Sequence, residues 1–321
     1  MIRLLTLDAA TYRSSELHAD DRVWVETNCY IDLWIEVLHA LALDCAPALA
    51  CTLSVVFEGD QWQFFKFPAE DLRELYGLEV AEMNPWRGLE HHIDEQLAMG
   101  RLLTAEVDSW YLPDTAGVSY GIEHVKTSIV PNMIDRDAKR LGYFHGAGYH
   151  ELGGDDFAGI FGHGIERPEM LSPYVELVKL DAMKRLDEHE LVDAALALVR
   201  LHLARRPTSN PVQRFRKRLE QDVEWLRADG IATFHLYAFA TLRQFGSAAE
   251  LAGSLCDWLA QRGQPTTEVA GQLFELASSA KTAQFQLARL VSGRAVDPDP
   301  TLDSMERGWD TAMHSLVETY E

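Results

Sequence analysis

The chain has 321 residues, of which 47% are hydrophobic and 25% are charged, a composition typical of a globular protein with about two domains. It carries 29 Lys and Arg against 50 Asp and Glu, so its net charge is −21. A surface this acidic repels phosphate groups, and we therefore expect neither a nucleic acid nor an anionic membrane as a partner.

No apolar run approaches the roughly 18 residues of a membrane span. Within residues 1–21 only Arg3 precedes the first acidic residue, Asp8, and the segment lacks a signal-peptidase site. These features predict a cytoplasmic protein. The four cysteines, Cys29, Cys45, Cys51 and Cys256, include no C-x-x-C pair, so we expect free thiols and predict neither a metal site nor a cofactor.

The first half of the chain has a mixed pattern. Apolar residues from Tyr30 to Leu41 recur at helical spacing. Residues 51–67 favour two strands joined at a turn. Two short helices follow within residues 68–77 and 84–101, each with a glycine at its end.

Extended segments come next. Residues 102–113 predict a strand, and residues 123–130 predict another because they are rich in β-branched side chains. Pro131 is expected to end that second strand. Residues 140–152 predict a strand pair with a glycine bend.

The second half is dominated by helical periods from Tyr174 onward, with five to seven helices expected in a bundle. A segment rich in Gly and Pro lies before it. We therefore predict an α+β domain over residues 1–168 and an all-helical domain over residues 169–321. The basic segment "RFRKR" (214–218) is either a solvated helix face or a docking patch for an acidic partner.

Cys29 stands at the predicted start of the first long helix. A helix N-terminus stabilises a thiolate and offers free N–H groups to a developing oxyanion. Asp32, three residues later, opposes this effect unless its side chain points elsewhere. Cys29 is therefore either a nucleophile or a small buried apolar residue.

His124 is a candidate general base because it begins an extended segment. Strand alternation places His124, Lys126 and Ser128 on one face, where they can present a polar row to a cleft. A structural role for the histidine is the alternative. A third group that orients the imidazole is expected on or before the next strand, where His145, Asp135 and Asn132 are candidates.

These pieces resemble the papain-like cysteine fold, and in particular the N-terminal domain family of butirosin biosynthesis protein H, whose members act as acyltransferases. The matching segments are "TNCYIDLWIEVLHALALD" (27–44), "VDSWYLP" (107–113), "EHVKTSIV" (123–130) and "LGYFHGAGYHEL" (141–152). The whole chain also resembles an uncharacterised bacterial protein family with the pattern "YLPDTAG…HVKT…LGYFH.AGY".

The resemblance implies that Cys29 is the nucleophile and His124 the base, with His145 in the position that usually holds an Asp or Asn. His145 supplies no carboxylate charge, so either the activity is tuned differently, or Asp135 takes the orienting role, or the site is no longer catalytic. Asn28, Asp108 and Lys126 are the expected substrate-binding residues, and Asp108 alternatively caps a turn at the strand end.

Three functions are compatible with these residues. The first is transfer of an acyl or aminoacyl group from a carrier protein's phosphopantetheine thioester to a small amine, through an acyl-enzyme on Cys29. The second is a non-catalytic protein that binds a carrier or another partner. The third is a cysteine amidase or peptidase.

Overall fold

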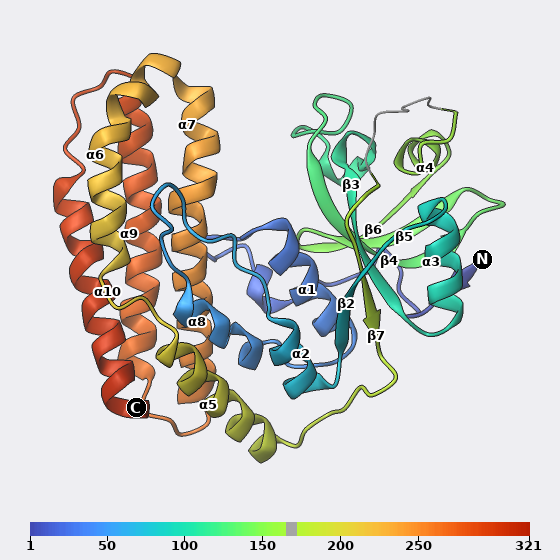
Figure 1. Cartoon of the computed structure of the whole chain (residues 1–321), viewed down its shortest axis with the longest axis horizontal. Coiled ribbons are helices and arrows are strands. Elements are labelled where there is room, and N and C mark those ends of the chain that lie inside the picture. Colours follow the sequence, from blue (N-terminus) through green and yellow to red (C-terminus); the bar gives the residue numbers. More distant parts are fainter. Residues whose placement is uncertain (165–171) are drawn as a thin grey trace. The chain divides into compact units, whose positions relative to one another are not determined.

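The computed structural model describes residues 1–164 and 172–321 (Figure 1). They form two compact units, and neither unit is one continuous stretch of sequence. The first contains Met1–His18, Cys29–Asp44 and Pro68–Arg185, and the second contains Ala19–Asn28, Cys45–Phe67 and Leu186–Glu321. The predicted boundary between residues 168 and 169 lies outside the described residues.

The first unit is built on a sheet in which seven described strands pair antiparallel, in the order β2-β7-β3-β4-β5-β6, with β1 paired to β4. The strands are β1 (Ile2–Arg3), β2 (Glu79–Met83), β3 (Leu102–Asp108), β4 (Lys126–Asp135), β5 (Arg140–His145), β6 (Gly148–Gly153) and β7 (Val175–Lys179). The predicted α+β character of this half is confirmed.

The helices of the first unit connect and cover the strands. They are η1 (Glu16–His18), α1 (Cys29–Ala40), α2 (Ala69–Tyr76), α3 (Leu89–Ala98), η3 (Ser109–Tyr111), η4 (Pro113–Thr115) and α4 (Asp155–Ile160). Helix α1 packs against β4, β5 and β6. All its residues from Tyr30 to Leu38 are buried, so the amphipathic pattern seen in the sequence belongs to a helix enclosed on more than one side.

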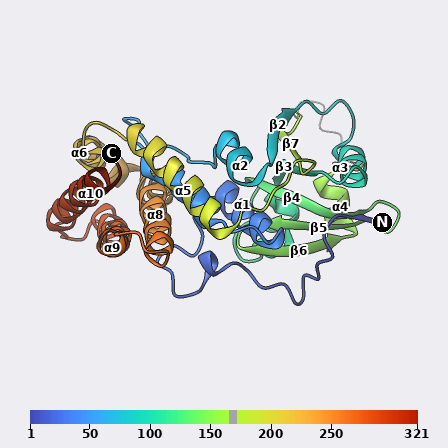
Figure 2. The same cartoon turned by 90° about the horizontal axis from the view of Figure 1, so that it is seen from below.

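The second unit is helical, as predicted. Its elements are η2 (Ala46–Ser54), α5 (Glu188–Ala204), α6 (Pro211–Asp229), α7 (Ile231–Ala238), the π-helical turn η5 (Phe239–Arg243), α8 (Gln244–Ala260), α9 (Thr267–Val291) and α10 (Asp299–Tyr320). Helices α6, α9 and α10 contact one another and run side by side (Figures 1 and 2). No described helix is both long enough and apolar enough to cross a membrane.

Local sequence explains where these helices begin and end. Helix α5 starts at a capping box in which Asp187 and Glu190 satisfy each other's backbone N–H groups. The side chain of Asn210 caps α6, whose first residue is Pro211. Helix α2 ends at Gly77, which has a left-handed φ of 69°.

Three predicted elements are wrong. Residues 51–67 form no strand pair: the 3₁₀ helix η2 occupies Ala46–Ser54, and only an isolated bridge joins Phe57 to Trp62. The apolar run belongs to a buried helical turn, which short apolar segments do not distinguish from a strand.

Strand β4 does not end at Pro131. It continues to Asp135, and its register with β5 shifts between Pro131 and Met133. A bulge tolerates the missing N–H of proline inside a strand.

Residues 175–179 are also not helical. They form β7, which lies between β2 and β3 in the sheet. Val175 and Val178 are almost completely buried, as expected for a central strand whose sequence does not alternate cleanly.

Candidate active site

Cys29 is the first residue of α1 and is partly exposed, whereas Cys45, Cys51 and Cys256 are buried. All four are free thiols. Burial raises the pKa of Cys256 to about 12. Cys29 is therefore the cysteine that reagents and substrates reach most readily.

His124 is held by the end of strand β3. Its Nδ1 donates to Oδ2 of Asp108 at 2.6 Å, and its ring stacks on Trp110 with 4.4 Å between centroids and 13° between planes. Asp108 also caps the 3₁₀ turn η3 by accepting from the backbone N–H of Trp110 at 3.0 Å. One carboxylate thus fixes both the histidine and the aromatic ring beneath it.

Backbone pairing brings these residues together. Asp108 pairs with Lys126 across β3 and β4, and the N–H of Ser109 donates to the carbonyl of Val125 at 2.9 Å. The chain therefore closes next to His124, although 16 residues separate it from Asp108. The His124 side chain is 56% exposed, and within the described residues no hydrogen bond engages its Nε2.

The first turn of α1 lies on the same face of the sheet as Asp108. The hydroxyl of Tyr30, next to Cys29, donates to Glu176 Oε2 at 2.7 Å. Thr104 donates to the same oxygen at 2.8 Å, and Thr104 and Glu176 are paired in β3 and β7. Thr104 and Asp108 are four residues apart on one strand, so they share a face and lie roughly 13 Å apart.

No hydrogen bond joins the Cys29 sulfur to His124 within the described part of the chain. The contacts of Tyr30 place the start of α1 on the sheet face of Asp108, and no described contact brings Cys29 to His124.

His145 is not brought together with His124. Its Nδ1 donates to Asp114 Oδ2 at 2.5 Å, and the Thr127 hydroxyl donates to its Nε2 at 2.8 Å. Thr127 alternates with Lys126 and Ser128 along β4, so His145 lies on the sheet face opposite to Asp108.

The Asp114 carboxylate that binds His145 is only 9% exposed. Burial tends to raise its pKa, but hydrogen bonds from His145 and Tyr143 and the nearby charge of His150 outweigh burial and lower it. The result is a polar cluster separate from His124.

The alternative orienting residues have structural partners. Asn132 is completely buried, accepts from the N–H of Leu5 at 2.8 Å and donates to the Leu5 carbonyl at 3.0 Å. Asp135 accepts from the N–H of Ala138 at 3.0 Å. Neither contributes a described hydrogen bond to His124.

The predicted substrate-binding residues also have partners. Asn28 is 1% exposed and donates to the Phe65 carbonyl at 3.2 Å and to Gln244 at 3.3 Å. Lys126 donates to Glu106 at 2.6 Å, with its side chain 71% exposed. Their roles in substrate binding stay predictions.

Sequence reasoning missed Trp110 and the Asp108–His124 pair, but its alternative interpretation of Asp108 as a turn cap is confirmed. The segment "DSW" (108–110) indicates a turn, because an Asp side chain often accepts a hydrogen bond from the backbone N–H two residues later. The pairing of Asp108 with His124 had no comparable local signal.

Two of the four basic residues in segment 214–218 form ion pairs with neighbouring carboxylates. Arg216 contacts Asp299 at 2.8 Å, Asp303 at 2.5 Å and Glu306 at 3.3 Å. Arg218 contacts Asp222 at 2.8 Å. These ion pairs favour the interpretation of a solvated helix face.

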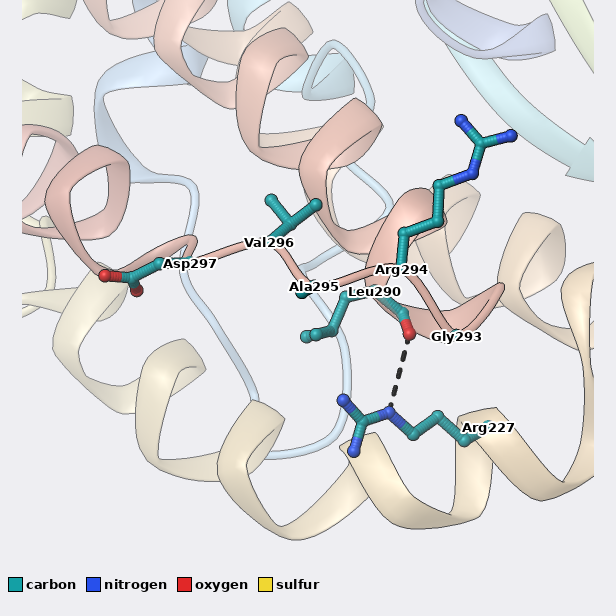
Figure 3. Close-up of a pocket in the computed structure, with 7 residues that line it drawn as sticks. All are labelled: Arg227, Leu290, Gly293, Arg294, Ala295, Val296 and Asp297. Atoms are coloured by element: carbon teal, nitrogen blue, oxygen red, sulfur yellow. Dashed lines mark hydrogen bonds between the residues drawn. The ribbon is translucent and has the colours of Figure 1, made fainter.

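A pocket of about 620 Å³ in the second unit is lined by Arg227, Leu290 and residues 293–297. Arg227 donates to the Leu290 carbonyl at 3.4 Å, and the guanidinium of Arg294 points away from Arg227 (Figure 3). The two cations do not converge, so we assign no ligand to this pocket. Among the described residues, no group of His, Cys, Asp and Glu is arranged to hold a metal ion.

Two family models match the chain. Residues 13–180 match the model of the DUF1839 N-terminal domain, and residues 188–318 match that of the DUF1839 C-terminal domain. The chain therefore belongs to the DUF1839 family. No curated protein matches it.

Proposed function

We propose that the first unit is a cysteine-dependent acyltransferase in which Cys29 is the nucleophile, His124 the general base and Asp108 the orienting carboxylate. The observation that carries the proposal is the fixed His124 ring, bound to Asp108 at 2.6 Å and stacked on Trp110. A carboxylate at Nδ1 selects the tautomer whose Nε2 accepts a proton, and it stabilises the imidazolium that then forms.

The proposed steps require Cys29 and His124 to meet around a bound thioester. His124 Nε2 takes the proton of Cys29, and the thiolate attacks the carbonyl carbon of a thioester. The donor's thiolate leaves and takes this proton from His124, so it departs as a thiol, and an acyl-enzyme remains on Cys29. An amine then attacks the acyl group, its proton passes to His124, and the Cys29 thiolate is released.

The resemblance to papain-like proteins supports Cys29 as nucleophile and His124 as base. The orienting residue differs: the resemblance implied His145, and we assign Asp108. A thioester is the proposed donor, and a carrier protein's phosphopantetheine arm presents such a group. The segment 214–218 adds no support for carrier docking, since Arg216 and Arg218 already have acidic partners.

The test uses an aminoacyl N-acetylcysteamine thioester as donor and intact-mass spectrometry to detect the acyl adduct. The wild type is expected to gain one acyl group, and Cys29→Ala none. His124→Gln and Asp108→Asn are expected to slow acylation by about a hundredfold or more, the usual contribution of a positioned base. His189→Gln is the matched control, because His189 is 87% exposed and pairs only with Asp193 on its own helix in the described contacts.

An acyl adduct that persists in Cys29→Ala would contradict the proposal. Binding of the thioester without an adduct would favour a non-catalytic binding protein. Loss of the adduct to water, with or without an amine present, would favour the amidase or peptidase alternative.

A further inference from the structure

A buried ionic cluster lies against the first two turns of α1. The ring of His18 sits between two carboxylates, with Nδ1 2.5 Å from Glu36 Oε1 and Nε2 3.3 Å from Asp32 Oδ1. The side chains of His18, Asp32 and Glu36 are 0%, 3% and 0% exposed. Tyr12 donates to the other Glu36 oxygen at 2.6 Å, and the N–H of Ser15 donates to Oε1 at 3.0 Å.

Two carboxylates in such a place require a positive charge, because an uncompensated buried charge is very costly. Burial lowers the pKa of His18, but its hydrogen bonds to Asp32 and Glu36 outweigh burial and raise it to about 9. His18 is therefore an imidazolium at neutral pH, and the cluster carries one net negative charge.

The cluster bears directly on Cys29. Asp32 is three residues after Cys29 on α1, and side chains at this spacing are neighbours, with Cβ atoms about 5–6 Å apart. Without a counter-charge, Asp32 would disfavour a thiolate at Cys29. Glu36 is seven residues away, roughly 10 Å along the helix, and its effect on the thiolate is weaker.

We propose that His18 is a positioning residue for Cys29: its imidazolium offsets the charge of Asp32, one helical turn from the thiol, and so favours nucleophilic attack by Cys29. The inference rests on the proposed function, because it concerns the same nucleophile. It adds a residue 11 positions upstream, which neither touches substrate nor forms part of the Asp108–His124 pair.

The test measures the rate at which iodoacetamide alkylates Cys29 at pH 7, with the modified peptide identified by mass spectrometry. His18→Gln is expected to slow the reaction by about tenfold, since it leaves the Asp32 charge unopposed. Adding Asp32→Asn to this variant is expected to restore most of the rate. Adding Glu36→Gln instead removes the same charge from a more distant position and is expected to restore much less.

If His18 had only a structural role, Asp32→Asn and Glu36→Gln would not differ in how much alkylation rate they restore. Equal recovery by both substitutions, or a wild-type rate in folded His18→Gln, would overturn the inference. If His18→Gln does not fold, the single variants decide: Asp32→Asn is expected to speed alkylation more than Glu36→Gln, and the reverse order refutes the idea.

Failure of the proposed function has a different signature. It would appear as a Cys29 that reacts with iodoacetamide but forms no acyl adduct with the thioester. The relative rates in the His18 series would still report on the charge around Cys29.

Discussion

At the scale of single residues, the carboxylate beside His124 changes the interpretation of the site. The sequence suggested His145 as the orienting group, and His145 would have supplied no negative charge. Asp108 supplies one, and the His124 ring is held between it and Trp110. Asp32, which seemed to oppose a thiolate at Cys29, is paired with His18. Each observation removes an objection to the proposed role of Cys29.

His18 also makes the stability of the protein depend on pH. Its pKa of about 9 in the folded state lies above the unfolded value of about 6.5. Folding is therefore stabilised fully below pH 6.5, and this contribution is lost as the pH rises through 9, by an amount on the order of 3 kcal/mol. Urea unfolding between pH 6 and pH 9.5 measures the decline. His18→Gln should flatten it, and an unchanged decline in that variant would contradict the assignment.

At the scale of elements, prediction succeeded where a local pattern was sufficient. Helix α1 followed from its apolar spacing, α2 from its acidic first turn and Gly77, and the β5–β6 pair from its glycine bend. It failed for η2 and β7, whose apolar runs have no distinct period. In such segments burial by neighbouring elements, and not local preference, decides between helix and strand.

The end of α2 provides a test at this scale. A Cβ on Gly77 would lie 2.0 Å from the Ala182 carbonyl oxygen, and φ is positive. Gly77→Ala is expected to cost about 3 kcal/mol or more, from the clash and the left-handed backbone together. Gly100→Ala, at the end of α3, has a similar φ of 76° but open space around its Cβ, and about 1 kcal/mol is expected. Equal losses in chemical denaturation would contradict the role of the clash.

At the scale of the whole molecule, the helical unit takes part of its core from the N-terminal half of the sequence. Trp24 donates from its backbone N–H to Glu250 at 2.8 Å and from its indole to the Ala277 carbonyl at 3.1 Å. Trp62 stacks on Phe245 with 4.4 Å between ring centroids. The helix η2 packs against α5 and α8.

A fragment of residues 186–321 alone should therefore not fold cooperatively. It lacks Trp24, Trp62 and η2, so apolar surface on α5 and α8 would be exposed to water. Thermal unfolding followed by circular dichroism should show a broad transition for the fragment and a cooperative one for the full chain. Co-expression with residues 1–185 supplies the missing segments and should restore cooperativity. A sharp transition in the isolated fragment, at the temperature of the full chain, would disprove this dependence.

Sequence patterns alone were sufficient to predict the α+β class, the start of α1 at Cys29, the strand after His124 and the helical second half. These features depend on contacts within a few residues, so residue spacing and capping residues are sufficient to predict them. The fold was needed to show that Asp108 binds His124 and that Asp114 binds His145. It was also needed to show that residues 19–28 and 45–67 are part of the helical unit. Each of those depends on strand register or on burial between distant segments, which local preference does not encode.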